Sequence, residues 1–532
     1  MLPRLLNTAW MLRCLPDARA FHRATGDVAR CQEALLREML HRNRDTIFGR
    51  EHGFESIHTV AKFQRRVPLA TYESFSTHVD QIARGASRVL TEDPVTIFEP
   101  TSGTSSGRKL IPYTAGLQRQ FQRAINPWIA DLLGRRPAVR AGRAYWSVSP
   151  ALGPRELTEG GIPIGFEDDT AYLGLAERLL VNKLLAVPTF VARIPDMEDF
   201  RYATLLHLLR ARDLSLISVW SPSFLTRLLE PLEAWGDRLS RDLQDDASMR
   251  EILRAASPLA EKIQRIWPKL ALISCWTDAG AAACLPELRR IFPEVEIQPK
   301  GLIATEACVS FPLLDEPGAA LALRSHFLEF VPHGEHGERA EICLVQDLEI
   351  GRQYQVIVTT AGGLYRYQLF DIIEVVGFKA ACPLVRFIGR ANGTSDLVGE
   401  KLDEVHVRTV LERVFAECGI EVHFSLVVPV AAPTPHYRLY VQSQLELPLT
   451  RLCELVQRGL EENPYYRHAI QMKQLAPLDL CLLDAAGPTG WEYVERAAAA
   501  RGQKIGDVKP RTLDPWPGWS AIFAATSPRH GG

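Results

Sequence analysis

Apolar residues along the chain follow two different periods, and each predicts a different kind of element. Between residues 28 and 43 they recur at helical spacing with charged residues between them, which predicts an amphipathic helix. Short apolar or aromatic runs farther along predict buried strands at residues 145–148, 216–220 and 270–274, with helices at 222–235 and 285–292. Buried strands that alternate with helices predict an α/β domain with a largely buried sheet.

The pattern changes after about residue 320. Successive strand-like runs at residues 326–331, 340–345 and 354–359 are separated by turns that contain glycine, which predicts an antiparallel sheet or a distorted barrel. Residues 391–395 form a break. The rest of the chain predicts a small α+β domain: a helix at 403–417, strands at 421–428 and 436–443, a helix at 448–462, then a final strand and helix. We therefore predict two domains, residues 1–400 and 401–532.

Composition narrows the class of protein. With 532 residues, 46% hydrophobic and 23% charged, the chain is long enough for more than one ordinary globular domain. Its net charge of −2 gives no general attraction to nucleic acid or to an anionic membrane. The ten cysteines include no C-x-x-C pair, and no apolar run reaches transmembrane length. We expect a cytoplasmic protein with reduced thiols and with neither nucleic acid nor membrane as a partner.

The most informative motif is the sequence TSGTSSGRK at residues 101–109. Its glycines allow backbone N–H groups to approach phosphate oxygens, its hydroxyls can donate to them, and Arg108 or Lys109 adds positive charge. It is not a Walker loop, because the glycines are four apart and Leu110 follows the lysine. A flexible surface turn is the alternative. The strand-like residues on either side, 97–98 and 110–111, favour a phosphate-binding loop between two strands.

Further motifs follow in a fixed order. GLIATE at residues 301–306 comes after a strand-like segment, and LYRYQLFD at 364–371 leads into an apolar run. FIGR at 387–390 and DLVGEK at 396–401 come next. This combination resembles the Gretchen Hagen family of acyl-acid amido synthetases, a branch of the adenylate-forming superfamily. The resemblance covers nearly the whole chain, from TIFGREHGF at 46–54 and VPLATYE at 67–73 to NPYY at 463–466 and VKPR at 508–511.

The resemblance implies a fold, an activity and roles for named residues. The fold would be that of adenylate-forming enzymes: a large N-terminal domain with α/β sheets and a distorted β-barrel, and a small mobile α+β C-terminal domain. With ATP and Mg²⁺, the enzyme would adenylate a carboxylic acid and transfer the acyl group to an amine, with an amino acid as the expected acceptor. The phosphate-binding residues would be Ser102, Thr104, Ser105, Ser106 and Lys109.

The later motifs would supply the rest of the nucleotide site. Thr305 would contact the α-phosphate, and Glu306 would help to hold Mg²⁺, which prefers carboxylate and phosphate oxygens. Asp371 would accept hydrogen bonds from both ribose hydroxyls. Arg390 would contact the ribose or the phosphates. Lys401 and Lys509 would neutralise charge as pyrophosphate leaves.

Two positions depart from the family's pattern. Leu302 stands where the family has Tyr, so stacking on adenine would be replaced by apolar contact. Phe370 stands where the family has Gly before the ribose-binding Asp, and its Cβ restricts the backbone there. Either substitution is compatible with a specialised, a weakened or an inactive nucleotide site.

Several alternatives stay open at this level. The enzyme could pass the acyl group to a thiol such as coenzyme A, or the chain could bind nucleotide without turnover. Locally, residues 365–367 could be ordinary alternating strand residues. His333 and His336 are interpreted as solvated residues of a turn, and Cys308 as a small buried thiol. Aromatic and apolar residues at 145–147, 160–163 and 221–224 are expected to line a pocket for an aryl or apolar acid.

Overall fold

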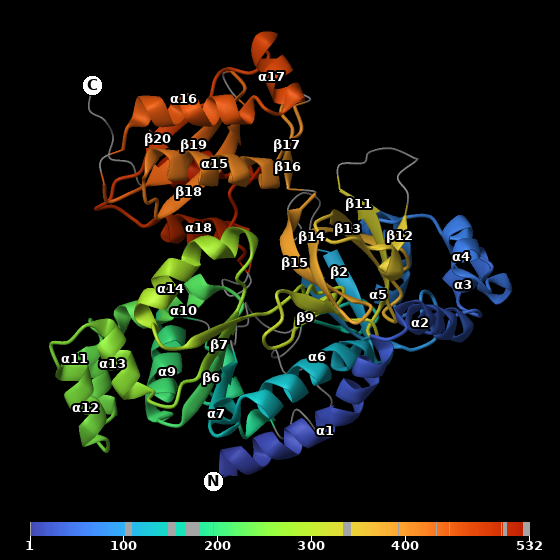
Figure 1. The fold of residues 1–532 in the computed structure, drawn as a ribbon, viewed down its shortest axis with the longest axis horizontal. Coiled ribbons are helices and arrows are strands. Elements are labelled where there is room, and N and C mark those ends of the chain that lie inside the picture. Colours follow the sequence, from blue (N-terminus) through green and yellow to red (C-terminus); the bar gives the residue numbers. More distant parts are fainter. Residues whose placement is uncertain are drawn as a thin grey trace. The chain divides into compact units, whose positions relative to one another are not determined.

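The structure, a computed structural model, describes residues 2–101, 109–146, 156–165, 181–194, 196–333, 342–391, 393–398, 400–431, 434–445, 447–501, 503 and 508–524. The chain divides into two compact units, Met1–Phe387 and Ile388–Gly532 (Figure 1). Each unit has its own hydrophobic core.

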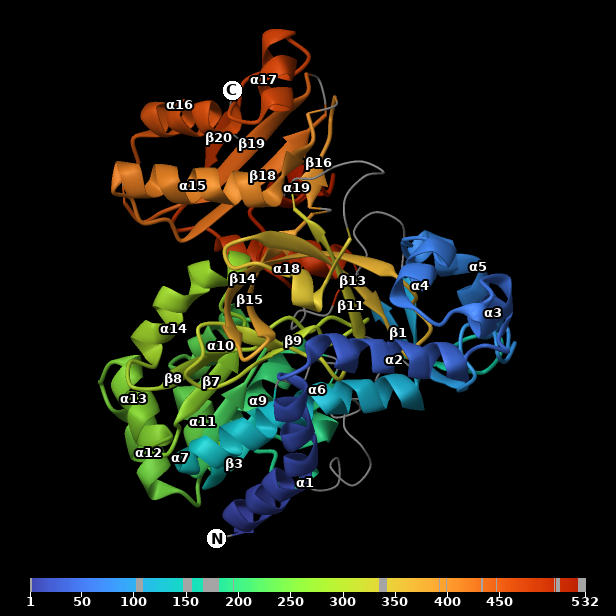
Figure 2. The ribbon, with the colours of Figure 1, turned by 45° about the vertical axis from the view of Figure 1, so that its right-hand side comes forward.

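The first unit begins with helices that enclose its core. The helix predicted at 28–43 is confirmed as α2 (Val28–Arg42), which starts where the carboxylate of Asp27 accepts the N–H of Arg30. The long helix α1 (Leu2–Ala24) lies along α6 (Ala115–Arg135), as Figures 1 and 2 show. The other helices of this part are α3 (Ile47–Glu51), η1 (Phe54–Ser56), α4 (Val60–Arg66), α5 (Tyr72–Ala83) and α7 (Pro137–Arg140).

A parallel sheet of four strands confirms the α/β prediction. Its order is β3-β6-β7-β8, with every pairing parallel. The strands are β3 (Arg143–Trp146), β6 (Leu214–Ser218), β7 (Leu272–Cys275) and β8 (Glu296–Pro299). Ile217 and Ile273 belong to the core with the helices that follow β6, whereas Leu216 and Leu272 belong to the core that contains α6. Both faces of the sheet are therefore covered.

Helices connect the strands of this sheet. They are α9 (Met197–Arg210), α10 (Pro222–Leu229), α11 (Gly236–Asp242), α12 (Ala247–Arg254), α13 (Leu259–Ile266) and α14 (Leu285–Ile291), with the short turns η3 (Thr189–Arg193), η4 (Glu230–Leu232) and η5 (Ala279–Cys284). The helix predicted at 222–235 is shorter than expected: α10 ends at Leu229, and Pro231 lies in the following η4 turn. The helix predicted at 285–292 is confirmed as α14.

A second sheet, in the order β2-β1-β5-β4, contains the strands on either side of the phosphate-loop motif. Strands β1 (Val95–Thr101) and β2 (Lys109–Thr114) are antiparallel, with Thr101 opposite Lys109, and β4 (Glu156–Leu157) and β5 (Pro163–Ile164) complete the sheet. The prediction that residues 97–98 and 110–111 belong to strands is confirmed.

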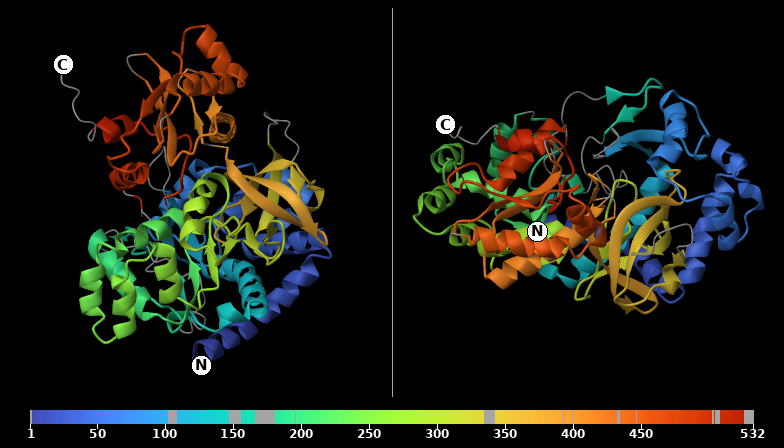
Figure 3. Two further views of the ribbon diagram at one scale, coloured as in Figure 1. Left: turned by 60° about the vertical axis from the view of Figure 1, so that its left-hand side comes forward. Right: turned by 90° about the horizontal axis from the view of Figure 1, so that it is seen from above.

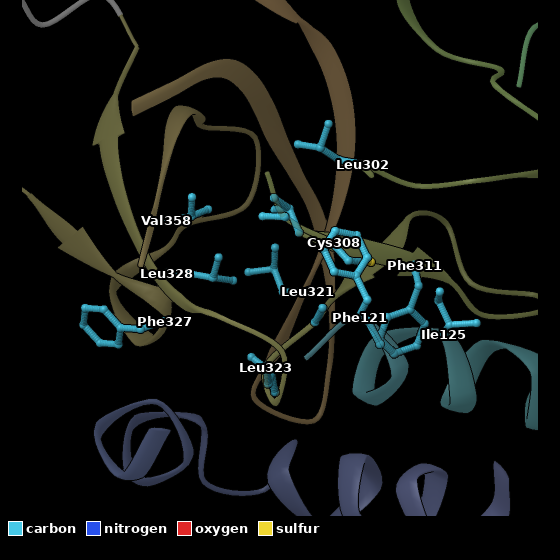
Figure 4. Packing of buried hydrophobic residues seen from close by; sticks show 14 of the residues in the cluster. Phe121, Ile125, Leu302, Cys308, Phe311, Leu321, Leu323, Phe327, Leu328 and Val358 are labelled. Carbon is cyan, nitrogen blue, oxygen red and sulfur yellow. The ribbon is translucent and has the colours of Figure 1, made fainter. Parts of the chain in front are cut away.

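The predicted antiparallel sheet after residue 320 has seven strands in the order β12-β11-β13-β14-β15-β10-β9. They are β9 (Ser310–Pro312), β10 (Ala319–Leu321), β11 (Phe327–Pro332), β12 (Cys343–Leu344), β13 (Gln353–Thr359), β14 (Tyr367–Lys379) and β15 (Cys382–Arg390). Of the run predicted at 340–345, residues 340 and 341 lie outside the described residues, and the strand β12 ends at Leu344 because Val345 begins the turn η6 (Val345–Asp347). Leu321, Leu328 and Val358 of this sheet and Phe121 of α6 lie in one core (Figure 4).

The second unit packs helices on both faces of the sheet β18-β19-β20 (Figure 3). Alternate residues separate the faces: Leu439 packs with α15 and α16, and its neighbour Tyr440 packs with α18 and α19. The elements are β16 (Thr394–Ser395), β17 (Leu402–Asp403), α15 (Glu404–Cys418), β18 (Phe424–Val430), β19 (His436–Gln442), α16 (Leu449–Leu460), α17 (Pro464–Gln471), β20 (Asp479–Leu482), α18 (Gly490–Ala500) and α19 (Trp519–Ala524).

Helix α17 was not predicted, although its start signal is present in the sequence. Asn463 accepts the N–H groups of Tyr465 and Tyr466, and Pro464 occupies the first helical position. All ten cysteines lie in the described residues and are free thiols, as expected. Among the helices described, none is both long and apolar enough to cross a membrane.

Candidate active site

The phosphate-loop motif lies between the paired ends of β1 and β2. Ser102, Thr104, Ser105 and Ser106 lie outside the described residues. Lys109 is the first residue of β2, and its Nζ lies 3.9 Å from Oε1 of Glu73 and 5.5 Å from the ring centroid of Tyr72. The structure thus places the cation at the end of the hairpin, beside the first turn of α5.

Thr305 and Glu306 lie in a tight turn that follows β8. Ile303 and Cys308 form an isolated antiparallel bridge, and the N–H of Ala304 donates to the carbonyl of Ala307 at 2.9 Å. The hydroxyl of Tyr113 on β2 donates to the carbonyl of Thr305. The turn therefore has a fixed shape and is joined to the strand that follows the phosphate-loop motif.

A buried histidine holds the far side of this turn. The N–H of Cys308 donates to Nε2 of His326 at 3.0 Å, so Nδ1 carries the ring proton and donates to Oε1 of Gln120, also at 3.0 Å. The same Gln120 oxygen accepts the N–H of Ala361. Burial lowers the pKa of His326 to about 3, so the ring is neutral at pH 7. Gln120 lies on α6, so this network joins both the Glu306 turn and the segment that contains Ala361 to that helix.

Cys308 itself is confirmed as a small buried thiol. It is fully buried in the core, and burial raises the pKa of the thiol to about 12, so it is not a thiolate at neutral pH (Figure 4). Leu302 is also a core residue, with 5% of its surface exposed. The apolar contact expected from Leu302 is thus made, in this structure, with the protein's own core (Figure 4).

The strand β14 brings the LYRYQLFD motif next to the Glu306 turn. The hydroxyl of Tyr367 donates to Oε1 of Glu306 over 3.5 Å. Asp371 lies farther along the same strand and is 2% exposed. Phe370, which directly precedes Asp371, has a left-handed backbone with φ of 62°. The position where the family has Gly therefore keeps the backbone conformation that glycine favours, although it carries a phenyl side chain.

Residues 365–367 are not ordinary alternating strand residues. Tyr365, Arg366 and Tyr367 are all buried, and Arg366 has φ of 50°. The ring of Tyr365 stacks on Phe48 with centroids 4.8 Å apart, and the N–H of Ala70 donates to the carbonyl of Arg366. The two early segments that share the family resemblance, 46–54 and 67–73, therefore support the motif that contains Asp371.

The three remaining predicted residues belong to the second unit. Arg390 is the last residue of β15, and Lys401 and Lys509 have exposed side chains. Lys401 has φ of 45°, and its carbonyl accepts the side-chain amide of Asn463. Thus Lys109, Thr305, Glu306 and Asp371 lie in the first unit, and Arg390, Lys401 and Lys509 in the second.

Sequence reasoning missed the residue that shapes the segment before Lys401. Glu400 is fully buried, and its carboxylate accepts the N–H groups of Leu397 and Val398, each at 2.8 Å, and the hydroxyl of Tyr437. Burial and the nearby Glu400 carboxylate raise the pKa of Tyr437. The sequence offers one signal for this role, the acidic residue next to Lys401 in DLVGEK, but it does not indicate which groups that residue binds.

Within the part of the chain that the structure describes, no group of three or more His, Cys, Asp or Glu side chains could hold a metal ion. Among the described residues, Glu306 thus belongs to no such cluster. Of the two histidines interpreted as turn residues, His333 follows β11 directly, and His336 lies outside the described residues.

The parallel and antiparallel sheets, with the Glu306 turn beside β14, and the separate C-terminal unit make this a mixed α/β protein of two units. The chain matches the GH3 family N-terminal domain over residues 17–297, the GH3 family central domain over 319–390 and the GH3 family C-terminal domain over 405–515. It belongs to the GH3 family.

Named relatives and a solved structure extend over most of the chain. The chain is 24% identical to the indole-3-acetic acid-amido synthetase GH3.3 of Arabidopsis thaliana, over 93% of this chain and 91% of the relative. It is 24% identical to the indole-3-acetic acid-amido synthetase GH3.8 of Oryza sativa subsp. indica, over 74% and 71%. The structure of AtGH3.15 acyl acid amido synthetase in complex with 2,4-DB superimposes with a TM-score of 0.79 at 20% identity, covering 97% of this chain and 96% of that one.

Proposed function

We propose that this protein is an ATP-dependent acyl acid amido synthetase. In the first step, a carboxylate oxygen of the acid attacks the α-phosphorus of ATP, which forms an acyl-adenylate and releases pyrophosphate. In the second step, an amine attacks the acyl carbon, an amide bond forms, AMP leaves and the amine loses a proton. Adenylation is needed because a free carboxylate is a poor electrophile, whereas the mixed anhydride has a good leaving group.

The observation that carries this proposal is the contact between Tyr367 and Glu306. It joins two motifs that are 61 residues apart in the chain, so the Glu306 turn and the strand of Asp371 lie side by side. Glu306, which we propose for the phosphate end of ATP, and Asp371, which we propose for its ribose, lie on these adjoining segments. Tyr113 adds β2, and with it Lys109, to the same arrangement.

Each predicted residue has a role that suits its chemistry. The hydroxyls of Ser102, Thr104, Ser105 and Ser106 and the ammonium of Lys109 would hold the β- and γ-phosphates. Thr305 would contact the α-phosphate, and Asp371 would accept both ribose hydroxyl protons. In the second unit, Arg390 would contact the ribose or the phosphates. Lys401 and Lys509 would neutralise the charge that develops as pyrophosphate leaves.

Magnesium fits this donor set. Mg²⁺ is usually bound through one or two carboxylates together with substrate phosphates, and Glu306 offers one carboxylate on a fixed turn. When bound, the ion would neutralise phosphate charge. Glu306 would orient it, and Tyr367 would orient Glu306.

The activities of the relatives and of the solved structure guide the choice of acceptor. The relatives named above are amido synthetases for indole-3-acetic acid, and the solved structure is an acyl acid amido synthetase with 2,4-DB bound. We therefore propose an amino acid as the acceptor. A thiol acceptor, which would give a thioester ligase, and a nucleotide-binding protein without turnover are the competing functions.

The decisive experiment incubates the protein with ATP, Mg²⁺, a panel of carboxylic acids and the amino acids, and measures pyrophosphate. Release that depends on an acid, with an amide detected by mass, is the expected result. If a thioester with coenzyme A forms in place of the amide, the acceptor is a thiol and not an amino acid. Nucleotide binding without pyrophosphate release from any acid would overturn the enzymatic proposal.

A further inference from the structure

The long helix α1 has two apolar sides, and only one of them belongs to the core. Trp10 and Phe21 are buried in the core of the first unit, in which α1 lies along α6 (Figures 1 and 2). By contrast, Leu2, Leu5 and Leu12 are 63%, 68% and 55% exposed. A single exposed leucine is ordinary, but several on one helix indicate a surface that meets a partner.

The exposed leucines form one stripe along the helix. Residues 2, 5, 9, 12 and 16 are all exposed and apolar, and each follows the previous one by three or four positions. Residues at this spacing lie on the same side of an α-helix. They make up a stripe about four turns long on the side of α1 away from the core. We call it the outer stripe; its members are Leu2, Leu5, Ala9, Leu12 and Pro16.

The charged residues exposed on α1 are all arginines. They are Arg4, Arg13, Arg19 and Arg23. The one acidic residue of the helix, Asp17, is engaged within the first unit: Nη1 of Arg324 donates to its carboxylate at 2.9 Å, and Nδ2 of Asn126 donates at 2.8 Å. Apart from the outer stripe and the arginines, the helix exposes only His22. The outer face of α1 is therefore both apolar and positively charged.

This composition suits a lipid surface better than a protein surface. The residues that dominate protein interfaces are Trp, Tyr and Arg, with leucine under-represented, and the outer face of α1 exposes neither Trp nor Tyr. Helices that lie at a lipid–water interface combine leucines with basic residues. A second copy of the chain is disfavoured as the partner, because it would bring arginines against arginines.

We propose that the outer face of α1 binds the surface of an anionic lipid membrane. The outer stripe would enter the boundary between headgroups and acyl chains, and arginines such as Arg4 and Arg19 would bind lipid phosphates. The helix would lie in the plane of the surface. The net charge of −2 does not predict this contact, because it averages the whole chain, whereas a membrane acts on charges within about a Debye length.

The test measures cosedimentation of the full chain with lipid vesicles. One set of vesicles is phosphatidylcholine alone, and the other is phosphatidylcholine and phosphatidylglycerol in equal parts. We expect binding to the anionic vesicles to be about 10-fold or more tighter, and to weaken as salt is added. The assay needs no ATP, acid or turnover, so its result does not depend on the proposed function.

Two double variants separate the apolar and the charged contributions. Leu5→Gln with Leu12→Gln should lower binding by about 10-fold or more, and it should keep the helix, because Gln and Leu have similar helix propensities. Arg4→Gln with Arg19→Gln should lower binding to the anionic vesicles by about 10-fold or more, since one cation near such a surface contributes about five-fold. This second variant should leave binding to phosphatidylcholine unchanged.

The matched controls change residues of the same types outside α1. Leu157 and Leu445 are 60% and 62% exposed, and Arg65 and Arg66 are exposed on α4. Changing both leucines to Gln, or both arginines to Gln, should leave vesicle binding at the level of the wild type.

Three results would overturn the proposal. They are no binding to either kind of vesicle, binding that is independent of lipid charge, and control variants that lose as much binding as the α1 variants. Sedimentation equilibrium without lipid identifies the competing partner. A dimer that Leu5→Gln with Leu12→Gln dissociates, together with no vesicle binding, would assign the outer stripe to a second copy of the chain.

Discussion

The guanidinium of Arg366 pairs with the carboxylate of Glu329 at 3.0 Å, and neither side chain is more than 3% exposed. Nη1 of Arg366 donates to the carbonyls of Gln64 and Val67, and the side-chain amide of Gln64 donates to Glu329. Arg366 lies one residue before β14. The pair therefore fixes the start of the strand that holds Tyr367 and Asp371.

Removing one partner of this buried pair should destabilise the first unit strongly. Glu329→Gln leaves the charge of Arg366 buried without its counter-ion, at a cost of about 3–5 kcal/mol in the free energy of unfolding. Urea denaturation measures it. The control is Arg37→Met, which removes the exposed ion pair of Arg37 with Glu33 and should change stability by less than about 1 kcal/mol. Similar small losses in both variants would contradict the structural role of the pair.

Asp371→Asn tests the ribose contact. We expect the variant to fold and to bind ATP more weakly, because an amide cannot accept both hydroxyl protons as a carboxylate does. The KM for ATP in acid-dependent pyrophosphate release is the measurement. An unchanged KM would remove Asp371 from the nucleotide site.

Glu306→Gln tests the magnesium site. Loss of the carboxylate should lower adenylation by roughly 10²-fold or more, the scale seen when a group that stabilises transition-state charge is removed. Tyr367→Phe is the companion variant: it removes the 3.5 Å hydrogen bond to Glu306 but keeps the carboxylate, and it should have a much smaller effect. Turnover near wild type for Glu306→Gln would leave Glu306 a structural residue.

Lys401→Ala and Lys509→Ala test a division of labour between two half-reactions. We propose that residues 401–532 form a small mobile domain and that a cation of it meets charge that develops only during adenylation. Such a variant should lose pyrophosphate release by several kcal/mol in activation free energy, while at least one of the two still transfers a preformed acyl-adenylate to the amine. Both half-reactions are measured on both variants. Equal losses in the two steps for both lysines would reject this division.

The buried His326 predicts a loss of stability in mild acid. Its folded-state pKa is lowered to about 3 by burial, so the folded protein keeps the ring neutral while the unfolded chain takes up a proton below about pH 6.5. Stability is therefore fully present above that pH and falls as the pH decreases toward 3, by up to about 1.4 kcal/mol per pH unit. Urea denaturation at pH 7 and pH 5 should show a smaller pH effect in His326→Gln than in the wild type. The exposed His58, changed to Gln, should leave the pH effect unchanged.

Local patterns in the sequence predicted the elements that local physics decides. The helix α2, the strands β3, β6 and β7 and the helix α15 follow from apolar periodicity, because the side-chain period of an element is a property of its own backbone. Helix α17 was missed even though its Asn463 cap and Pro464 are local signals. The prediction at 222–235 ran past Pro231, where the helix could not continue.

The sequence by itself determined the order of the motifs, the family and the residue types offered to ATP. Only the tertiary structure decided which of them meet. The contact of Tyr367 with Glu306 and the pairing of Arg366 with Glu329 join residues far apart in the chain, and no local period encodes such pairs. Ser218, Ser274 and Gln298 likewise become neighbours only through the register of three parallel strands. Register depends on the burial of a whole face, so it is set when the core packs and not by any one segment.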